Sequence, residues 1–307
     1  MPRHAANPID LHVHSWFSDG SQSPEGLVAA AVEVGVQVLG LTDHDTVAGV
    51  VAAVDAAARH GVRLIPGVEI STSLPLRLEP PERLPVHLLG YGYDPTDEEL
   101  LDTLAFSARA RDRRIRRIVA RLRELGVPVD AERVFALAGT GSVGRPHVAL
   151  ALVEIGAAAN VRDAFARFLG SGKPAYVRRP PVDTEATIEL IRRAGGAPVL
   201  AHPDEFRDRD ETGQPRAEPR YDDLERLLDR LVPAGLLGME VDYGDYDATV
   251  RAALRAIAER RGLAATGGSD YHGLTVKPDR PLGMAPVPPA AVEELDAAIA
   301  LAQRQRP

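Results

Sequence analysis

Strand-like and helical runs alternate along most of this sequence, and that alternation constrains the fold more than any other feature. The strand-like runs lie at residues 9–14, 36–41, 63–71, 85–93, 197–201, 236–241 and 263–267. The helical runs lie at residues 23–33, 46–60, 184–194, 221–232, 247–261 and 290–303. Alternation of this kind is typical of parallel βα units. Seven strands connected by helices or long crossovers predict an α/β barrel rather than an open sheet.

The alternation is interrupted in the middle of the chain. Helical candidates follow one another at residues 97–125, 131–137, 145–155 and 161–169, without a strand between them. We therefore expect a small helical domain, residues 97–173, inserted into a barrel formed by residues 8–96 and 174–303. The proline-rich segment 74–84 is expected to be an exposed loop.

Composition excludes several classes of protein. Among 307 residues, 45% are hydrophobic and 26% are charged, which is typical of a soluble globular enzyme. There is no cysteine, no bilayer-spanning apolar run and no signal-peptide pattern, so we expect a cytoplasmic protein without disulfides, thiolate metal sites or membrane attachment. A net charge of −8 argues against a general nucleic-acid-binding surface.

Histidines and carboxylates gather where the predicted strands end. They are His12, His14, Asp43, His44, Glu69, His202, Asp270 and His272, while His87 lies within its strand. The carboxyl ends of barrel strands converge on one face, where active sites are built. We therefore expect one cluster of these side chains, whereas His4 and His60 need no special role.

The segment His12-Val13-His14 is the most specific element of this set. Residues i and i+2 of a strand point to the same face, so both imidazoles can reach one ion. Asp19 follows on a tight turn, and Glu69 can bridge two ions. Imidazole and carboxylate ligands without thiolates suit Zn²⁺, Mn²⁺ or Fe²⁺ and are too nitrogen-rich for Ca²⁺ or Mg²⁺ alone.

Paired divalent ions would supply hydrolytic chemistry. Ions about 3.5–4 Å apart share a water, lower its pKa towards neutrality and hold it for in-line attack on phosphorus. No side-chain nucleophile is then required, and neither Ser15 nor Ser142 is flanked by a triad pattern.

The motifs DLHVHSWFSDG, GLTDHDT, PGVEIS, HLLGYG, AHP and GSDYHG together resemble those of the PHP (polymerase and histidinol phosphatase) family, over nearly the whole chain. The resemblance implies a distorted seven-stranded β/α barrel that holds two or three divalent metals (Mn, Fe or Zn, with Mg allowed at one site) and hydrolyses phosphoesters. It implies a first metal on His12, His14, Glu69 and Asp270, a second on Glu69, His87 and His202, and a third on Asp19, His44 and His272. Glu69, Asp270 and His202 would be the catalytic residues around a metal-bound water.

The segments GRPHVA and FLGSGKPAYV resemble one PHP branch, which removes phosphate from nucleoside 3′,5′-bisphosphates. In that branch the insertion closes over the barrel mouth and binds phosphate, which assigns this role to Arg145, His147 and Lys173. Arg145 and His147 also lie at a predicted helix start, where backbone N–H groups favour anions. Otherwise they would be a surface arginine and a capping histidine.

Metal-bound histidines usually donate their other ring nitrogen to a carboxylate or carbonyl. Asp43 and Glu240 are the candidates for this role, although Glu240 could equally be an ordinary strand-end carboxylate. The roles of Arg178, Asp204 and Asp242 stay open. The first two depart from the branch pattern, with Arg178 where proline is expected.

The sequence thus predicts a metal-dependent phosphatase or phosphodiesterase for small nucleotides, with trimming of short RNA ends as compatible chemistry and no stable nucleic-acid binding. Histidinol-phosphate phosphatase is the alternative enzyme, but it needs a carboxylate-lined pocket for a cationic amine. A non-catalytic PHP module beside a polymerase is the alternative of another class. Oligomeric state is not predicted.

Overall fold

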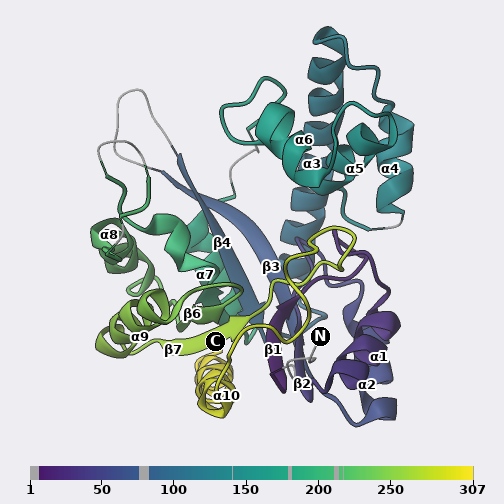
Figure 1. Ribbon diagram of the computed structural model, residues 1–307. Helices are drawn as coiled ribbons and strands as arrows, with labels where there is room; N and C mark the ends of the chain where they lie inside the picture. Colours follow the sequence, from purple (N-terminus) through teal and green to yellow (C-terminus); the bar gives the residue numbers. More distant parts are fainter. Residues whose placement is uncertain are drawn as a thin grey trace.

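The computed structural model describes residues 7–75, 83–139, 141–178, 182–210, 214–216 and 218–306. Seven strands form one sheet in sequence order (Figure 1). They are β1 (Ile9–Val13), β2 (Val38–Leu41), β3 (Arg63–Pro75), β4 (Arg83–Tyr91), β5 (Ala197–Leu200), β6 (Gly238–Tyr243) and β7 (Ala264–Gly268). The predicted seven-stranded α/β barrel is confirmed.

The strand directions correct one expectation. β1, β2 and β3 pair in parallel, and so do β5, β6 and β7, but β4 is antiparallel to both of its neighbours. β3 ends at Pro75 and β4 begins at Arg83, and a connection this short cannot form the crossover that parallel neighbours need. The expected loop at residues 74–84 is therefore shorter, because its ends belong to β3 and β4; residues 76–82 lie outside the described residues.

The sheet curls until its first and last strands meet, which makes the barrel nearly closed. The backbone N–H of His14 donates to the carbonyl of Tyr271 at 2.8 Å, and Val13 bridges to Tyr271 in parallel. A Cβ atom on Gly268 would lie 2.4 Å from the backbone nitrogen of His12. This close approach of β7 to β1 therefore requires glycine.

Helices cover the outside of the barrel (Figure 1). They are α1 (Pro24–Val34), α2 (Val50–His60), α7 (Thr184–Arg193), α8 (Asp222–Leu231), α9 (Ala248–Arg261) and α10 (Pro289–Arg304), with the 3₁₀ helix η2 at Pro203–Phe206. Ser23 caps α1 as expected, by accepting the Gly26 N–H at 3.0 Å. α2 begins at Val50 rather than at the predicted residue 46, because Asp45 has a left-handed φ of 53° and a turn follows it.

Among the described residues between β4 and α7, the named elements are all helices: α3 (Glu98–Glu124), α4 (Ala131–Ala138), α5 (Arg145–Glu154), α6 (Val161–Ala164) and the π-helix η1 (Phe165–Leu169). Leu100 and Leu104 of α3 pack in the barrel core, while Ile118 and Leu122 pack in a separate core of the helical region. One continuous helix thus joins the two cores. The domain boundaries at residues 97 and 173 stay a prediction.

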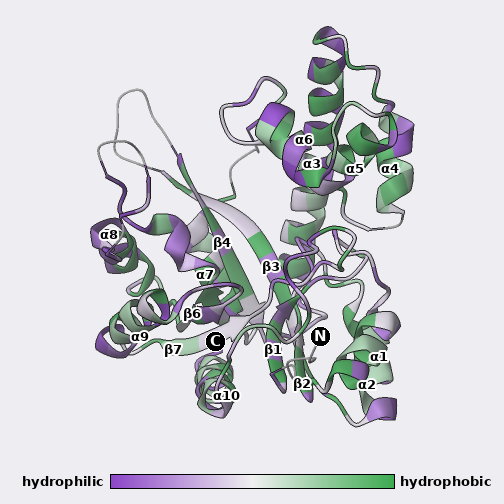
Figure 2. Ribbon diagram, in the orientation of Figure 1, coloured by the Kyte–Doolittle hydropathy of each residue, from purple (hydrophilic) through white to green (hydrophobic). Residues whose placement is uncertain are grey.

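The hydropathy of the chain follows this arrangement. Figure 2 shows hydrophobic residues concentrated along the strands, while the helices carry both hydrophilic and hydrophobic stretches. Burying the apolar stripe of each helix against the sheet is the usual source of stability in such layers. None of the helices that the structure describes is long and apolar enough to cross a bilayer.

Candidate metal centre

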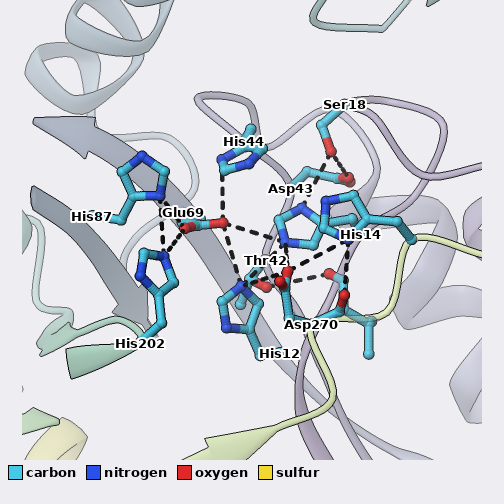
Figure 3. Close-up of polar contacts among 12 residues, drawn as sticks. His12, His14, Ser18, Thr42, Asp43, His44, Glu69, His87, His202 and Asp270 are labelled. Carbon is cyan, nitrogen blue, oxygen red and sulfur yellow. Dashed lines mark hydrogen bonds and ion pairs between the residues drawn. The ribbon is translucent and has the colours of Figure 1, made fainter. Parts of the chain in front are cut away.

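The predicted metal ligands meet at one end of the barrel (Figure 3). β1 carries His12 and is followed by His14 and Asp19, β2 is followed by His44, β3 carries Glu69, β4 carries His87, β5 is followed by His202, and β7 is followed by Asp270 and His272. His87 lies at the middle of β4, opposite Ser71 of β3, and it reaches this face because β4 runs in the opposite direction. The antiparallel direction of β4 therefore explains why His87 joins the cluster although it lies within its strand and not at the end of one.

Glu69 lies at the centre of the cluster and presents its two oxygens to different histidines. Oε1 lies 2.6 Å from Nδ1 of His87 and 3.2 Å from Nε2 of His202. Oε2 lies 3.3 Å from Nε2 of His12, 3.3 Å from Nε2 of His14 and 3.1 Å from Nδ1 of His44. This is the arrangement of a carboxylate that can bridge two cations.

The imidazoles of His12 and His14 face one another, with their Nε2 atoms 3.1 Å apart. Nδ1 of His12 lies 3.0 Å from the buried carboxylate of Glu240, which fixes the proton on Nδ1 and leaves the lone pair of neutral His12 on Nε2. Oδ1 of Asp270 lies 3.3 Å from Nε2 of His14. Three donor groups are thus directed at one point: the lone pair of His12, the imidazole of His14 and Oδ1 of Asp270. A cation fits between them.

Asp19 and His272 form the other end of the cluster, with Oδ1 of Asp19 3.2 Å from Nε2 of His272. Three groups of side chains have ligand atoms close enough to share an ion: His14, Asp19, His44 and His272; His12, His14 and Asp270; and His44, Glu69 and His87. Among the described residues, Oδ1 of Asp19 and Nδ1 of His44 are buried and make no aligned hydrogen bond, although Nε2 of His272 and Oε2 of Glu69 lie 3.2 and 3.1 Å away. Buried polar atoms normally have one, so their orientation also fits a cation.

Charge in the cluster favours ionised carboxylates. Burial alone would raise the pKa of Glu69, but His44 and His87 hold that pKa well below its ordinary value. Burial would lower the pKa of His14, yet hydrogen bonding to Asp270 and Glu69 raises it to about 9. The buried carboxylates therefore require positive charge at this position, which divalent ions can provide.

The outer partners of the cluster agree in part with the prediction. Both oxygens of Glu240 are used, one on His12 and the other accepting the backbone N–H of His202 at 2.8 Å. Asp43 instead accepts the hydroxyls of Ser15 at 2.6 Å and Ser18 at 2.7 Å, and the Ser18 hydroxyl lies 3.4 Å from Nδ1 of His14. Asp43 thus reaches a histidine only through a serine.

Asp270 has partners that the sequence reasoning missed. Its Oδ2 accepts the ammonium group of Lys277 at 2.5 Å and the hydroxyl of Tyr243 at 2.7 Å, while Oδ1 faces the histidines. Burial raises the pKa of this carboxyl, but the charges of Lys277 and His272 bring it well below its ordinary value. Lys277 is one of only two lysines in the chain, and that rarity was the available signal.

Asp10 was also missed, although it fixes the β1–β7 junction. Its buried carboxylate accepts the N–H of Ser269 at 2.8 Å, the hydroxyl of Ser269 at 2.6 Å and the N–H of Gly283 at 2.8 Å.

Two residues of the cluster have a backbone with positive φ. Asp270, which follows Ser269, has a left-handed φ of 54°, and His202 has a φ of 32°. Such strained backbone is held only by surrounding bonds and concentrates at functional sites.

Arg145 and His147 lie at the start of α5, over the cluster. Burial lowers the pKa of both side chains, and both also experience the charges of Asp19 and Arg111. NH1 of Arg145 donates to the carbonyl of Leu169 at 3.2 Å, and Nδ1 of His147 accepts the N–H of Gly144 at 3.0 Å. Lys173 is exposed in the turn after η1, so its phosphate role stays a prediction.

Arg111 of α3 is a buried cation beside this region that the sequence did not single out. Its Nε donates to Oδ2 of Asp45 at 2.5 Å, and its NH2 donates to the hydroxyl of Ser71 at 3.1 Å. It was hidden because it belongs to a run of arginines, most of which are exposed. Arg111 therefore ties the helical region to the strand that carries Glu69.

The three residues left open have other surroundings. Asp242 pairs with Arg255 at 2.6 Å. Asp204 accepts a hydrogen bond from the hydroxyl of Tyr221. Arg178 is exposed. These contacts give Asp204 and Asp242 structural roles.

Comparison with known proteins agrees with this geometry. Residues 10–128 match the family model of the PHP domain. The chain is 36% identical over 265 residues to the 5′-3′ exoribonuclease Rnm of Escherichia coli, covering 86% of this chain and 84% of that protein. It is 33% identical over 269 residues to the 3′,5′-nucleoside bisphosphate phosphatase of Chromobacterium violaceum, covering 86% of this chain and 87% of that protein.

Solved structures extend the likeness to the fold. A protein from Bifidobacterium adolescentis described as a metal-dependent phosphoesterase superimposes with a TM-score of 0.80 and 33% identity, over 94% of this chain and 96% of that one. An amidohydrolase from Chromobacterium violaceum with bound sulfate and no metal gives a TM-score of 0.81 and 32% identity, over 95% and 96%.

Proposed function

Because this chain belongs to the PHP family, we propose that it removes the 3′-phosphate from nucleoside 3′,5′-bisphosphates with the help of two or three divalent ions. The observation that carries the proposal is Glu69, whose two oxygens face separate sets of imidazoles below Arg145 and His147. A relative at 33% identity is named 3′,5′-nucleoside bisphosphate phosphatase, which supports the same substrate class.

We assign three ion positions to this cluster, as the resemblance implies. The first uses His12, His14, Glu69 and Asp270, the second Glu69, His87 and His202, and the third Asp19, His44 and His272. When bound, the ions polarise phosphoryl oxygens and lower the pKa of a water. Mixed nitrogen and oxygen ligands favour Mn²⁺, Fe²⁺ or Zn²⁺, with Mg²⁺ allowed at one position.

The chain's own residues prepare this chemistry. Glu240 holds the proton of His12 on Nδ1, so that the lone pair on Nε2 is available to a ligand at the centre. Lys277 and Tyr243 occupy Oδ2 of Asp270, which leaves Oδ1 directed at the cluster. Glu69 neutralises charge on both sides of the cluster at once.

Arg145 and His147 are proposed to bind the phosphate that is not cleaved, with Lys173 approaching from the turn after η1. Arg145 is the stronger case, because its planar fork can bind a phosphate through two hydrogen bonds. Its ring neighbours Phe165 and Tyr176, 5.3 and 5.9 Å from its guanidinium carbon, orient the side chain. The helical region thus contributes substrate recognition, and the barrel contributes catalysis.

Trimming of short RNA ends is a second candidate, favoured by one observation. Relatives from Escherichia coli and Salmonella typhimurium, 36% and 38% identical to the chain, are both named 5′-3′ exoribonuclease Rnm. Hydrolysis of a phosphodiester and of a phosphomonoester needs the same ions and the same activated water. We therefore propose both activities at one centre.

The test compares phosphate release from a nucleoside 3′,5′-bisphosphate, a nucleoside monophosphate, histidinol phosphate and an aryl phosphate, with added Mn²⁺. The wild type should prefer the bisphosphate. Arg145→Ala should cost about 1.5–3 kcal/mol, or about 10- to 150-fold in kcat/KM, on the bisphosphate and much less on the aryl phosphate. Arg162→Ala, an exposed arginine of the same helical region, is the control.

Two results would contradict the proposal. Preference for histidinol phosphate would favour the alternative enzyme. An equal loss on both substrates in Arg145→Ala, with unchanged metal content and melting temperature, would place Arg145 at the reacting phosphate instead.

A further inference from the structure

Asp43 is a buried carboxylate to which none of the roles proposed above gives a task. Its Oδ1 accepts the backbone N–H of Ser15 and the hydroxyl of Ser18, both at 2.7 Å, and its Oδ2 accepts the hydroxyl of Ser15 at 2.6 Å. Burying a carboxylate costs free energy unless hydrogen bonds compensate, and these three bonds do so. One of them leads to the metal centre.

Ser18 lies between Asp43 and His14 (Figure 3). Its Oγ lies 2.7 Å from Oδ1 of Asp43, and 3.4 Å from both Nδ1 of His14 and the carbonyl oxygen of Ser15. A hydroxyl has one proton to donate and two lone pairs that accept. The shortest contact, to the carboxylate of Asp43, takes that proton. Ser18 is therefore an acceptor towards His14, and Nδ1 of His14 is the donor.

The other nitrogen of His14 faces the centre of the cluster. Nε2 lies 3.1 Å from Nε2 of His12, 3.3 Å from Oε2 of Glu69 and 3.3 Å from Oδ1 of Asp270. On the outer side, Oδ1 of Asp19 is 3.9 Å from Nδ1, which is too far for a hydrogen bond. A histidine that holds its proton on Nδ1 has its lone pair on Nε2, where a ligand to a cation needs it.

The turn after β1 brings Ser18 to the ring of His14. The N–H groups of Ser18 and Gly20 both donate to the carbonyl of Ser15 at 3.0 Å. A Cβ atom on Gly20 would lie 2.2 Å from the carbonyl oxygen of His14, so the turn can fold back this closely only with glycine. The backbone thus holds the hydroxyl of Ser18 beside a ring that lies four residues earlier in the chain.

The two histidines of the His12-Val13-His14 segment thereby have outer partners of the same kind. The carboxylate of Glu240 lies 3.0 Å from Nδ1 of His12 and contacts it directly. The carboxylate of Asp43 reaches Nδ1 of His14 through the hydroxyl of Ser18. Partners of this type fix the proton and the orientation of a metal-binding imidazole.

We propose that Ser18, supported by Asp43, is a positioning residue that holds the proton of His14 on Nδ1 and directs the Nε2 lone pair at the first ion position. The proposal rests on the proposed function only through that ion position and is independent of the substrate. The competing explanation is that Asp43, Ser15 and Ser18 merely stabilise the turn after β1.

The first test records the NMR signal of the His14 Nδ1–H group in the metal-free and the Zn²⁺-loaded protein, with His14→Gln to identify the signal. Ser18→Ala should shift this signal upfield or broaden it through exchange with water, because its acceptor is lost. Ser15→Ala is the matched control, since it removes a hydroxyl from the same carboxylate and also the acceptor of the Phe17 N–H at 3.1 Å. The signal should stay in place in this control.

The second test measures zinc affinity by titration against a competing chelator. In Ser18→Ala one of the bound ions should dissociate about 10- to 100-fold more readily, whereas in Ser15→Ala every ion should stay within about twofold of the wild type. Circular dichroism checks that both variants fold. An unchanged His14 signal in Ser18→Ala, or an equal loss of zinc affinity in the two variants, would overturn the proposal.

Failure of the proposed function has a different signature. A wild type that binds zinc but hydrolyses no nucleotide would overturn that function, while the NMR signal and the zinc affinity would still decide the role of Ser18. A wild type that binds no zinc at all would overturn the ion position, and the positioning role of Ser18 with it.

Discussion

At the scale of single residues, Glu69 determines the charge balance of the cluster, because five imidazoles lie within 3.3 Å of its two oxygens. Glu69→Gln preserves the shape of the side chain and removes its charge. We expect kcat to fall more than about a hundredfold, and more than for any other ligand substitution except Asp270→Asn. Steady-state kinetics with metal analysis checks this, with exposed Glu189→Gln as the control; activity within about tenfold of wild type would exclude a bridging role.

A second prediction at this scale concerns Lys277, whose ammonium group holds Oδ2 of Asp270 at 2.5 Å. Lys277→Met should lower kcat/KM about tenfold, or about 1.4 kcal/mol of barrier, because Asp270 loses the charge that orients it. Lys277→Arg should restore most of the activity by keeping that charge. Steady-state kinetics at saturating metal measures both variants. A Lys277→Met enzyme within about twofold of wild type would show that Tyr243 and Arg280, the other partners of Oδ2, position Asp270 without Lys277.

Residues that the sequence could reveal differ physically from those it could not. His12, His14 and Glu69 occur in local motifs whose spacing follows directly from strand geometry. Asp10 acts on Ser269 and Gly283, which the closure of the barrel brings to it, so no local pattern marks it. Lys277 lies only seven residues from Asp270, but the pair forms no recognisable motif. The expected outer partner Asp43 shows the same limit, since its contact with His14 runs through Ser18.

At the scale of elements, strand and helix positions were predicted within a few residues, but the direction of β4 was not. Periodicity reports which face of a strand is buried, and this is the same for either direction. The informative feature was the connection between β3 and β4, which is too short for a crossover helix. That same reversal brings His87 to the cluster.

The long helix α3 supports a prediction about stability, because it belongs to both hydrophobic cores. Ile118 is fully buried in the core of the helical region. Ile118→Ala should cost about 2–5 kcal/mol of unfolding free energy, through lost burial and the cavity left behind. Urea unfolding followed by circular dichroism measures the loss against exposed Arg117→Ala; a loss below about 0.5 kcal/mol would show that this core does not contribute to the cooperative unit.

At the scale of the whole molecule, the predicted PHP resemblance, the seven-stranded barrel and the class of metal-dependent phosphoesterase are confirmed by the family match and the relatives. These properties depend on several motifs in fixed order along the chain, which one sequence displays completely. A groove lined by Leu74, Leu84, Phe206 and Leu227 depends on β3, β4, η2 and α8 meeting in space. Nothing in the local sequence of any one of these elements predicts it.

Metal binding should couple the activity of the molecule to its stability. Asp19, Glu69 and Asp270 are buried carboxylates contributed by segments near both ends of the chain, so ions held between them join the first and last strands. A ligand that binds only the folded state stabilises it by about 2.7 kcal/mol at a hundredfold excess over Kd. We therefore expect chelation to abolish phosphoester hydrolysis and to lower Tm by several degrees, with Mn²⁺ restoring both. Calorimetry and elemental analysis on the same samples check this: full activity in metal-free protein would refute the metal centre, while a lost activity with unchanged Tm would confine the ions to catalysis.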